Sequence, residues 1–296
     1  GHAAVAASPT ASHMLRAIFQ PIIRSPKLTN ARCSCGTLRT LASVVPLGTL
    51  HPPPSAAALI IGNEVLSGKI QDTNTASLAR LLHARGVNLV RVVVVPDVKE
   101  DIASNVLRLR ELVGPSGFVF TSGGIGPTHD DITYESIAGA LGRDVEIHKG
   151  THQRMREFYE AQGKEVNASR LRMATIPVGS EVLTTPGVWV PLVRIENIYI
   201  LPGIPRLFNA MMDANKSRFT GPDIQLETIL TLQGEGEIAE ALREIALNFP
   251  EVQIGSYPKT TEEQKYTTKL TFESRDSALV SQAVAAARRV ITVLKE

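Results

Sequence analysis

The sequence predicts an α/β fold that is followed by a smaller α+β domain. From residue 56 to about residue 219, short apolar runs that suit buried strands alternate with segments whose apolar residues recur at helical spacing. Gly221-Pro222 then marks a boundary, because the order of the elements changes after it. We therefore divide the chain into a basic leader at 1–55, a large domain at 56–221 and a small domain at 222–296.

Composition and charge describe an ordinary globular chain with one unusual end. Of the 296 residues, 43% are hydrophobic and 20% are charged, and the formal net charge is +2. No Asp or Glu precedes Glu64, whereas arginines are spaced among apolar and hydroxyl residues from Met14 onward. This composition is typical of an organelle transit peptide, and the arginine spacing favours a mitochondrion over a plastid. A basic tail on a cytoplasmic protein remains the alternative.

The only cysteines, Cys33 and Cys35, also lie in the leader. Two thiols are too few for a zinc site, and the rest of the chain has no cysteine for a disulfide, so it suits a reducing compartment. No apolar run approaches the roughly 18 residues that span a bilayer, so we expect no membrane span. Basic residues are not grouped with aromatic residues beyond the leader, which argues against nucleic-acid binding.

Each element is predicted from its own pattern. In the large domain, strands are expected at 56–61, 89–95, 118–121, 188–196 and 197–201, and the last two are expected to form a hairpin. Helices are expected to end at Gly86 and near Val113, to begin near Ile132, and to occupy 151–175 and 206–219. The small domain is predicted as strand, helix, strand, strand, helix over 225–232, 238–247, 252–256, 266–272 and 277–294, similar to part of a ferredoxin-like sandwich.

The stretch TSGGIGPTHDD, which follows the third strand, has the residues of a phosphate-binding turn. Glycines between a strand and a helix let backbone N–H groups approach an anion, and the helix N-terminus adds a favourable dipole. Two adjacent carboxylates would repel a phosphate unless a cation lay between them, so the pattern favours a divalent metal with oxygen ligands. The residues concerned are Gly123, Gly124, Gly126, Pro127 and Thr128 for the phosphate, and Asp130 and Asp131 for the metal.

A purely structural interpretation of this stretch is also open. The glycines could form a tight turn, and Asp131 could cap the following helix. That interpretation explains one carboxylate, but it does not explain why Asp130, Thr133 and Glu135 lie in the same turn. Taken alone, the stretch does not separate the two interpretations.

A second polar group favours a ligand site. Glu64 follows the first strand, and Asp72, Thr73 and Asn74 precede the first helix, at the same carboxyl edge of the sheet as the glycine-rich loop. In open α/β sheets, ligands bind at this edge. Asp72 or Thr73 could be an N-cap only, but Glu64 has no such structural explanation.

Four segments, IIGNEVLSGKIQDTN, TSGGIGPTHDDITYE, LPGIP and GSYP, resemble the MoaB/Mog-type molybdopterin-binding domain. The resemblance extends from about Ala56 to the end of the chain. It points to the branch shared by CinA-like proteins and the N-terminal domain of eukaryotic FAD synthases. It implies a three-layer α/β/α sandwich with a mostly parallel sheet, plus a small C-terminal α+β domain of ferredoxin-like type.

For function, this branch implies an enzyme that hydrolyses a nucleotide pyrophosphate such as FAD or ADP-ribose, with the divalent cation Mg, Mn or Co as cofactor. Asp131 and Asp130 would hold the metal, and Glu135 or Glu64 would orient the attacking water. The nucleotide would contact the glycine-rich loop and a set of polar or small residues around it, namely Thr133, Asp72, Asn74, Pro202 and Gly203.

Two other functions stay open. Mog-type members of the family adenylylate molybdopterin, and such an adenylyltransferase would use the same phosphate loop. Asn63 departs from the more common acidic residue of the motif, which removes one candidate metal charge and favours a non-catalytic nucleotide-binding or structural subunit. The expected partners are accordingly a small-molecule nucleotide, further copies of the chain in a homo-oligomer, or a larger organellar complex.

Overall fold

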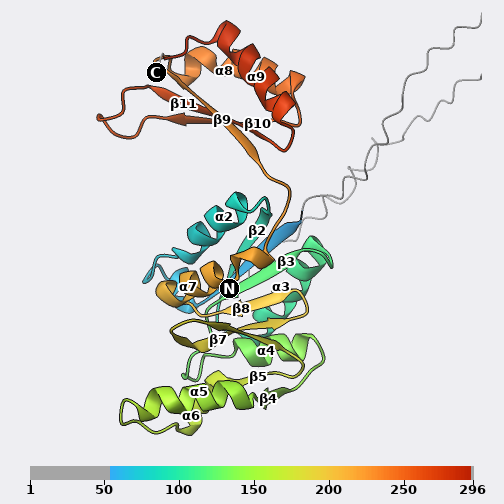
Figure 1. Ribbon diagram of the computed structural model, residues 1–296, viewed down its shortest axis with the longest axis vertical. Coiled ribbons are helices and arrows are strands. Elements are labelled where there is room, and N and C mark those ends of the chain that lie inside the picture. Colours follow the sequence, from blue (N-terminus) through green and yellow to red (C-terminus); the bar gives the residue numbers. More distant parts are fainter. Residues whose placement is uncertain (1–53, 295–296) are drawn as a thin grey trace, which may run out of the picture. The chain divides into compact units, whose positions relative to one another are not determined.

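The structure is a computed structural model that describes residues 54–294. The predicted transit peptide lies outside the described residues, so its mitochondrial address stays a prediction. The described part contains a six-stranded sheet with its helices and a separate three-stranded sheet with two helices (Figure 1). No helix in residues 54–294 is long and apolar enough to cross a membrane.

The large sheet has the strand order β2-β1-β3-β8-β7-β6. Its first four strands are parallel, whereas β7 and β6 run antiparallel to their neighbours, so the predicted mostly parallel sheet is confirmed. The predicted hairpin of the last two long strands is also present as β7 and β8. The bounds are β1 (Ser55–Ile61), β2 (Asn88–Val95), β3 (Phe118–Ser122), β6 (Glu181–Thr185), β7 (Val188–Ile195) and β8 (Ile198–Leu201).

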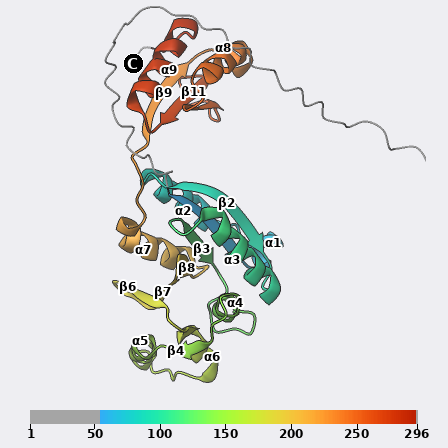
Figure 2. The same ribbon diagram turned by 90° about the vertical axis from the view of Figure 1, so that its right-hand side faces the viewer.

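Helices cover both faces of this sheet, which gives the predicted three layers (Figure 2). On one face α2 (Asn74–Ala84) and α7 (Pro205–Asn215) pack against the side chains of Ala56, Ala58 and Ile60. On the other face α3 (Lys99–Val113) and α4 (Thr133–Ala140) pack against the alternate residues of β1. Because β1 is buried on both faces, its sequence is a continuous apolar run rather than an alternation.

Local sequence explains where α2 ends. Leu78 and Leu82 lie one helical turn apart and are almost fully buried, and burial of each such side chain contributes about 1.5–3 kcal/mol. Gly86 follows the C-cap Arg85 with φ of +70°, a conformation that glycine adopts at little cost. The predicted stop at Gly86 is therefore confirmed.

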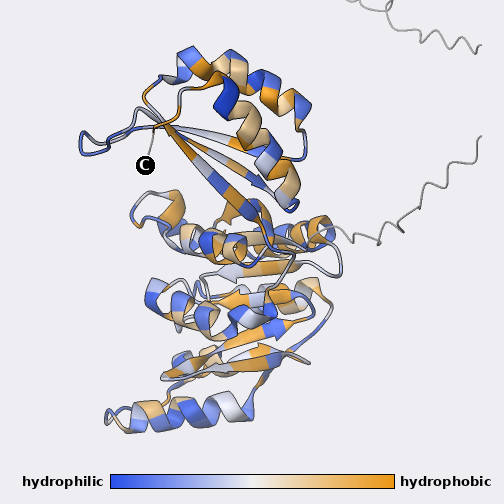
Figure 3. Cartoon of the chain, turned by 45° about the horizontal axis from the view of Figure 1, so that its top comes forward, coloured by the Kyte–Doolittle hydropathy of each residue, from blue (hydrophilic) through white to orange (hydrophobic). Residues whose placement is uncertain are grey.

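The connection between α4 and β6 differs from the prediction of one polar helix over 151–175. It contains α5 (Lys149–Glu160), the short α6 (Ala168–Leu171) and a 3-10 turn (Arg172–Ala174), flanked by β4 (Val145–Ile147) and β5 (Thr175–Pro177), which pair with each other. Strands β4, β5 and β6 have only three to five residues, too few to show a periodic pattern. The long helix at the bottom of Figure 3 is α5, and its mainly hydrophilic colour agrees with its exposed surface.

The small domain has the predicted order of elements. Its sheet has the order β10-β11-β9, all antiparallel, and its helices supply a core of their own with residues such as Ile238, Val280 and Val284. The last helix ends at Val290 rather than near residue 294, because Val293 forms a β-bridge to Thr231 in the first strand of the small domain. The bounds are β9 (Gln225–Thr231), α8 (Glu235–Asn248), β10 (Gln253–Pro258), β11 (Thr268–Ser274) and α9 (Ser277–Val290).

Candidate functional site

A cavity of about 440 Å³ lies at the carboxyl ends of the parallel strands. It is bordered by the residues that follow β1, β3 and β8, so the predicted edge of the sheet is where the cavity forms. Predicted site residues that line it are Glu64, Asp72, Asn74, Gly126, Pro127, Asp131, Pro202 and Gly203. The remaining predicted residues, Gly123, Gly124, Thr128, Asp130, Thr133 and Glu135, lie outside its lining.

Gly123 serves the packing of the loop rather than direct ligand contact. Its φ is +110°, and a Cβ at this position would lie 2.1 Å from the carbonyl oxygen of Ile61. Its backbone N–H donates to the carbonyl oxygen of Leu201 over 3.1 Å and is therefore occupied within the protein. The absence of a side chain lets the end of β1 approach the loop closely.

Thr133 fixes the same loop from the first turn of α4. Its hydroxyl donates to the carbonyl oxygen of Gly123 over 3.0 Å, and its backbone N–H donates to that of Gly124 over 3.0 Å. The Thr133 side chain is fully buried, which makes it a structural anchor. The backbone N–H groups of Gly124, Ile125 and Gly126 form no hydrogen bond with residues 54–294, so they are the donors that remain for an anion.

Asp131 does not cap the helix that follows it. The N-cap of α4 is Ile132, which makes no side-chain capping bond, whereas Asp131 Oδ2 accepts from the backbone N–H of Thr128 over 2.8 Å and from the Thr128 hydroxyl. A Cβ on Gly126 would lie 2.6 Å from the same Oδ2, so this glycine makes room for the carboxylate. The capping alternative is thereby wrong, and Asp131 lies at the cavity instead.

Asp130, by contrast, is exposed and lies outside the cavity lining. The nearby Thr128 side chain and the backbone N–H of Asp130 itself hold the pKa of Asp130 below its ordinary value. Asp130 is therefore a stable anion at neutral pH. The two adjacent aspartates occupy different environments, which a sequence pattern cannot distinguish.

Asp97 is a further carboxylate that the sequence argument missed. It follows β2, and its Oδ2 accepts the backbone N–H of Asn63 over 2.8 Å. Burial raises the pKa of Asp97, and the nearby charges of Glu64, Asp130 and Asp131 raise it further, against the opposing effect of the Asn63 hydrogen bond. Carboxylates after β1, β2 and β3 therefore gather in one region, and the sheet-edge rule that indicated Glu64 could have found Asp97 as well.

Asp72 and Glu64 line the cavity in different ways. Asp72 Oδ1 accepts from the backbone N–H of Thr75 over 3.1 Å, so Asp72 also stabilises the first turn of α2 as the capping alternative expected. Glu64 is exposed at the start of α1 (Asn63–Leu66), and its carboxylate lies over Gly62, 2.7 Å from where a Cβ would be. Glu64 has no hydrogen-bond partner for its carboxylate among residues 54–294 and is free to contact a ligand.

Asn74 joins the elements around the cavity. Its side-chain amide donates to the Ser122 hydroxyl and to the carbonyl oxygen of Gly203, both over 2.9 Å, although the residue is only 4% exposed. Its Oδ1 has no hydrogen-bond partner among the described residues. Ser122 in turn donates to the carbonyl oxygen of Pro202 over 3.4 Å, a geometry near the limit for a hydrogen bond.

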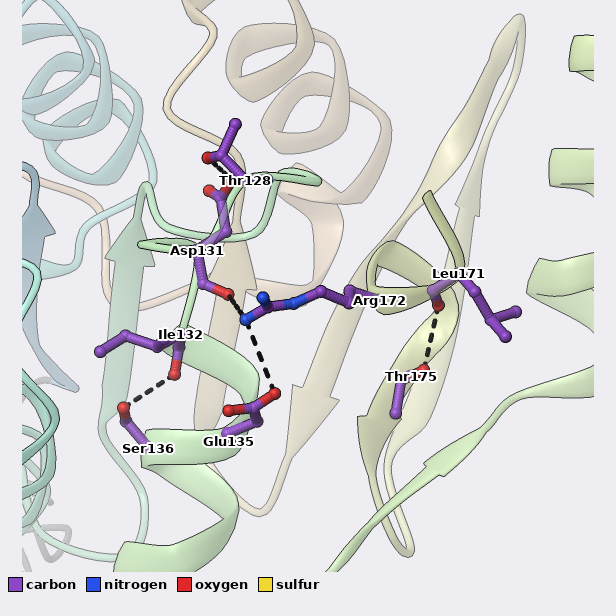
Figure 4. A network of polar contacts seen from close by, with 8 residues as sticks. All are labelled: Thr128, Asp131, Ile132, Glu135, Ser136, Leu171, Arg172 and Thr175. Atoms are coloured by element: carbon purple, nitrogen blue, oxygen red, sulfur yellow. Dashed lines mark hydrogen bonds and ion pairs between the residues drawn. The ribbon is translucent and has the colours of Figure 1, made fainter. Parts of the chain in front are cut away.

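Glu135 faces an arginine rather than the cavity (Figure 4). Its Oε1 lies 3.7 Å from the guanidinium of Arg172, which also donates to the backbone carbonyl oxygen of Asp131 over 3.0 Å. Both side chains are partly exposed, so their ion pair is weak. Glu64, Asp72 and Asp131 therefore line one cavity, and Asp97 lies near the charges of Glu64 and Asp131 without lining it. Glu135 also lies outside the lining.

No group of three or more His, Cys, Asp or Glu side chains within residues 54–294 is close enough to hold a metal ion on its own. The carboxylate oxygens at the cavity are nevertheless the ligands that hard divalent cations prefer, and Asp97 is destabilised as an anion by its neighbours. The donor chemistry therefore suits such a cation, which would need further oxygen ligands beyond these side chains.

Comparisons with known proteins agree with this fold. Residues 57–219 match the family model for a probable molybdopterin binding domain, and residues 223–293 match that for the FAD synthase middle domain. A protein of Pyrobaculum calidifontis is 35% identical over 221 residues, which cover 71% of this chain and 82% of that protein.

Two further relatives carry more descriptive names. A probable FAD synthase of Caenorhabditis elegans is 31% identical over 267 residues, which cover 80% of this chain but only 50% of that protein. The crystal structure of CinA from Thermoplasma acidophilum, a protein of unknown function, matches with a TM-score of 0.51 and 29% identity, covering 56% of this chain and 98% of that one. The chain belongs to the MoaB/Mog family of molybdopterin-binding domains, in the CinA-like branch close to the N-terminal domain of FAD synthases.

Proposed function

We propose that this protein hydrolyses the pyrophosphate bond of an ADP-containing nucleotide, FAD or ADP-ribose, with Mg, Mn or Co as the cation. The observation that carries the proposal is the juxtaposition of unpartnered backbone N–H groups at Gly124–Gly126 with carboxylates after three successive parallel strands. The N–H groups suit phosphate oxygens, and the carboxylates suit a cation that bridges to them.

The charge of the cavity supports a role for a cation. Among the described residues that line it, three are carboxylates, at positions 64, 72 and 131, and none is Lys, Arg or His. A pyrophosphate placed directly against these carboxylates would be repelled. A divalent cation, when bound, neutralises both sets of oxygens and lowers the pKa of a bound water.

Individual roles follow from where each side chain lies. Asp131 and Asp97 would hold the cation. Both are among the neighbouring carboxylates that follow β1, β2 and β3, and Asp131 lines the cavity. Exposed Asp130 would act on the cation through water rather than as a direct ligand. Glu64 would orient the attacking water, a role that Glu135 cannot fill while it faces Arg172.

The wall of the cavity supports a substrate with a flat heterocycle. Much of the lining is apolar, including Ile125, Met173 and Val190, and Ile204, which also lines the cavity, is 59% exposed. An adenine or isoalloxazine ring would bury such surface favourably. Water would then add to one phosphorus atom while the bridging P–O bond breaks, which releases two phosphate monoesters.

Asn63 does not weaken this proposal. Its side chain is exposed and is absent from the cavity lining, whereas its backbone N–H holds Asp97. Position 63 therefore contributes through its backbone N–H, which holds the Asp97 carboxylate. An acidic side chain at position 63 would leave this hydrogen bond unchanged.

The test is incubation of purified protein with FAD or ADP-ribose and each of the three cations, with AMP release measured by chromatography. We expect release with at least one cation and none in EDTA, and an Asp131→Asn variant should lose it. Intact substrates combined with no nucleotide binding would exclude the proposal and favour a structural subunit. AMP transfer from ATP to molybdopterin, assayed in parallel, would favour an adenylyltransferase instead.

The mitochondrial address is a separate proposal that rests on the composition of the leader. A fluorescent protein fused behind residues 1–53 should enter mitochondria. A matched fusion in which the leader arginines are replaced by glutamine should stay in the cytosol. Cytosolic fluorescence of the unmodified fusion would contradict the address.

A further inference from the structure

We infer that Arg172 is a positioning residue that holds the Thr128–Asp131 turn against the cavity. The inference rests on the proposed function, in which Asp131 of this turn holds the cation. Arg172 begins the 3-10 turn after α6, and its guanidinium reaches the main chain of Asp131, 41 residues earlier in the sequence (Figure 4). The contact is a hydrogen bond of 3.0 Å from Arg172 Nη2 to the backbone carbonyl oxygen of Asp131.

The turn needs an anchor from outside. Residues Pro127 to Asp130 are all exposed, and the one backbone hydrogen bond found within the turn, from Asp131 N–H to the carbonyl oxygen of Thr128, is long at 3.3 Å. The Asp131 carboxylate is held by Thr128, which belongs to the same turn and moves with it. Arg172 is the side chain that ties this unit to a separate part of the described fold.

The platform that carries Arg172 is itself firmly packed. Met173 and Ala174, the next two residues, are buried against Met155 of α5. The hydroxyl of Thr175 donates to the carbonyl oxygen of Leu171 over 3.0 Å, which closes the chain on the other side (Figure 4). Met173 also lines the cavity, so this segment supplies a wall residue and the anchor of the carboxylate turn together.

Arg172 makes two contacts of different strength, an ion pair with Glu135 and a hydrogen bond to the Asp131 carbonyl oxygen. The ion pair with Glu135 spans 3.7 Å between side chains that are 33% and 52% exposed, and such pairs contribute little. The bond to the Asp131 carbonyl joins a charged donor to a main-chain acceptor in the residue that faces the cavity, and charge-assisted bonds are about twice as strong as neutral ones. The carbonyl bond is therefore the one that positions Asp131.

Four variants separate these contributions. Arg172→Ala removes both contacts, Glu135→Gln removes only the ion pair, and Arg172→Lys keeps the charge without the planar fork. The matched control is Arg156→Ala, because Arg156 is also an ion-paired arginine, paired with Glu160 on the surface of α5, and lies outside the cavity lining.

Three measurements are made on the full chain. Hydrogen exchange of peptides covering 124–135 reports the order of the turn, titration with Mn²⁺ alone reports its affinity for a cation, and steady-state kinetics separate kcat from KM. For Arg172→Ala we expect faster exchange, weaker Mn²⁺ binding, and a kcat about 10-fold lower with KM little changed. Guanidinium chloride at millimolar concentration should restore part of kcat, which a general loss of stability would not allow. Glu135→Gln and Arg156→Ala should match the wild type.

The outcomes distinguish this inference from the proposed function. Unchanged exchange and unchanged Mn²⁺ affinity in Arg172→Ala would overturn the positioning role, whatever the activity of the wild type. A Glu135→Gln variant as defective as Arg172→Ala would overturn it too, since the ion pair would then be the active contact. Absence of turnover in the wild type, with faster exchange and weaker Mn²⁺ binding in Arg172→Ala, would reject the hydrolase and retain the anchor.

Discussion

Asn74 donates its side-chain amide to the backbone carbonyl oxygen of Gly203 over 2.9 Å, and so joins residues 129 positions apart in the sequence. Gly203 belongs to the loop after β8, and Asn74 begins α2, so the bond closes one side of the cavity. Both residues were predicted as nucleotide contacts, but this bond shows that Asn74 also serves the architecture of the site. Its Oδ1 is buried and has no hydrogen-bond partner among the described residues.

Substitution of Asn74 should therefore affect both stability and the site. Asn74→Ala leaves the Gly203 carbonyl and the Ser122 hydroxyl without their donor, and we expect a loss of about 1–3 kcal/mol in the free energy of unfolding. Asn105→Ala is the control, because Asn105 donates only to the Asp101 carbonyl of its own helix. Urea denaturation of both variants measures the difference, and equal losses would contradict the role of Asn74.

Replacement of Asp97 should stabilise the metal-free protein while impairing turnover. Because its pKa is raised in the folded state, ionised Asp97 opposes folding, and this destabilisation grows as pH rises through the unfolded and folded pKa values. Asp97→Asn keeps an oxygen for the Asn63 N–H and removes the charge. In EDTA its melting temperature should exceed that of the wild type at pH 7 and match it at about pH 3. Cation-dependent activity should fall about 10–100-fold.

The three glycines 68, 123 and 124 form a graded series. Gly68 has φ of +71° and no other atom within 4 Å of where a Cβ would lie, so Gly68→Ala should cost only about 1–2 kcal/mol of conformational strain. At Gly124 an added Cβ would lie 2.3 Å from the Thr133 hydroxyl, and at Gly123 it would lie 2.1 Å from a main-chain oxygen. In thermal unfolding, the Ala variant at Gly68 should lose the least stability, the variant at Gly124 more and the variant at Gly123 the most. The Thr133 side chain can move away from an added Cβ, whereas the main chain of a strand cannot. A different order would show that the loop adjusts more than its packing suggests.

Glu181 provides a pH-dependent test away from the cavity. The hydrogen bond from Arg194, with the charge of Arg218 nearby, holds its pKa below the ordinary value, so its stabilisation is present above the unfolded pKa and disappears as pH falls through the folded one. Since the side chain is 41% exposed, screening limits the effect of Glu181→Gln on the free energy of unfolding to about 0.5 kcal/mol at pH 7, and the effect should shrink as the pH falls below the unfolded pKa. The fully exposed Glu240, substituted in the same way, should show no measurable change.

The proposed domain boundary can be tested with a fragment. The two cores of the large sheet contain residues between 56 and 219 only, and the core of the small domain contains residues between 229 and 293 only. A fragment covering 54–222 should therefore unfold cooperatively by itself, and it retains the Gly221 N–H bond to the Arg85 carbonyl. Circular dichroism of a molten or insoluble fragment would show that the two cores depend on each other.

Long periodic elements were predictable because their signals are local. The valine-rich β2 and the one-sided apolar face of α3 follow from residue types that repeat over eight or more positions. The short strands β4 and β5 escaped prediction, because three residues hold no period and each strand exists only through pairing with the other. The predicted single helix over 151–175 was wrong for the same reason, because its last residue belongs to β5, which exists only through pairing with β4.

For the site, the sequence by itself determined which residues lie at the carboxyl edge of the sheet, since strand order along the chain places Glu64, Asn74 and the glycine-rich loop there. It also determined the family, because the motifs are recognised from the order of their residues and need no interatomic distance. Only the tertiary structure decided that Asp131 turns to Thr128 rather than to a helix, that Asp97 joins the carboxylates, and that Arg172 holds the turn. These contacts link residues from different strands and connections, and their geometry depends on how the layers pack, which no local pattern of side chains encodes.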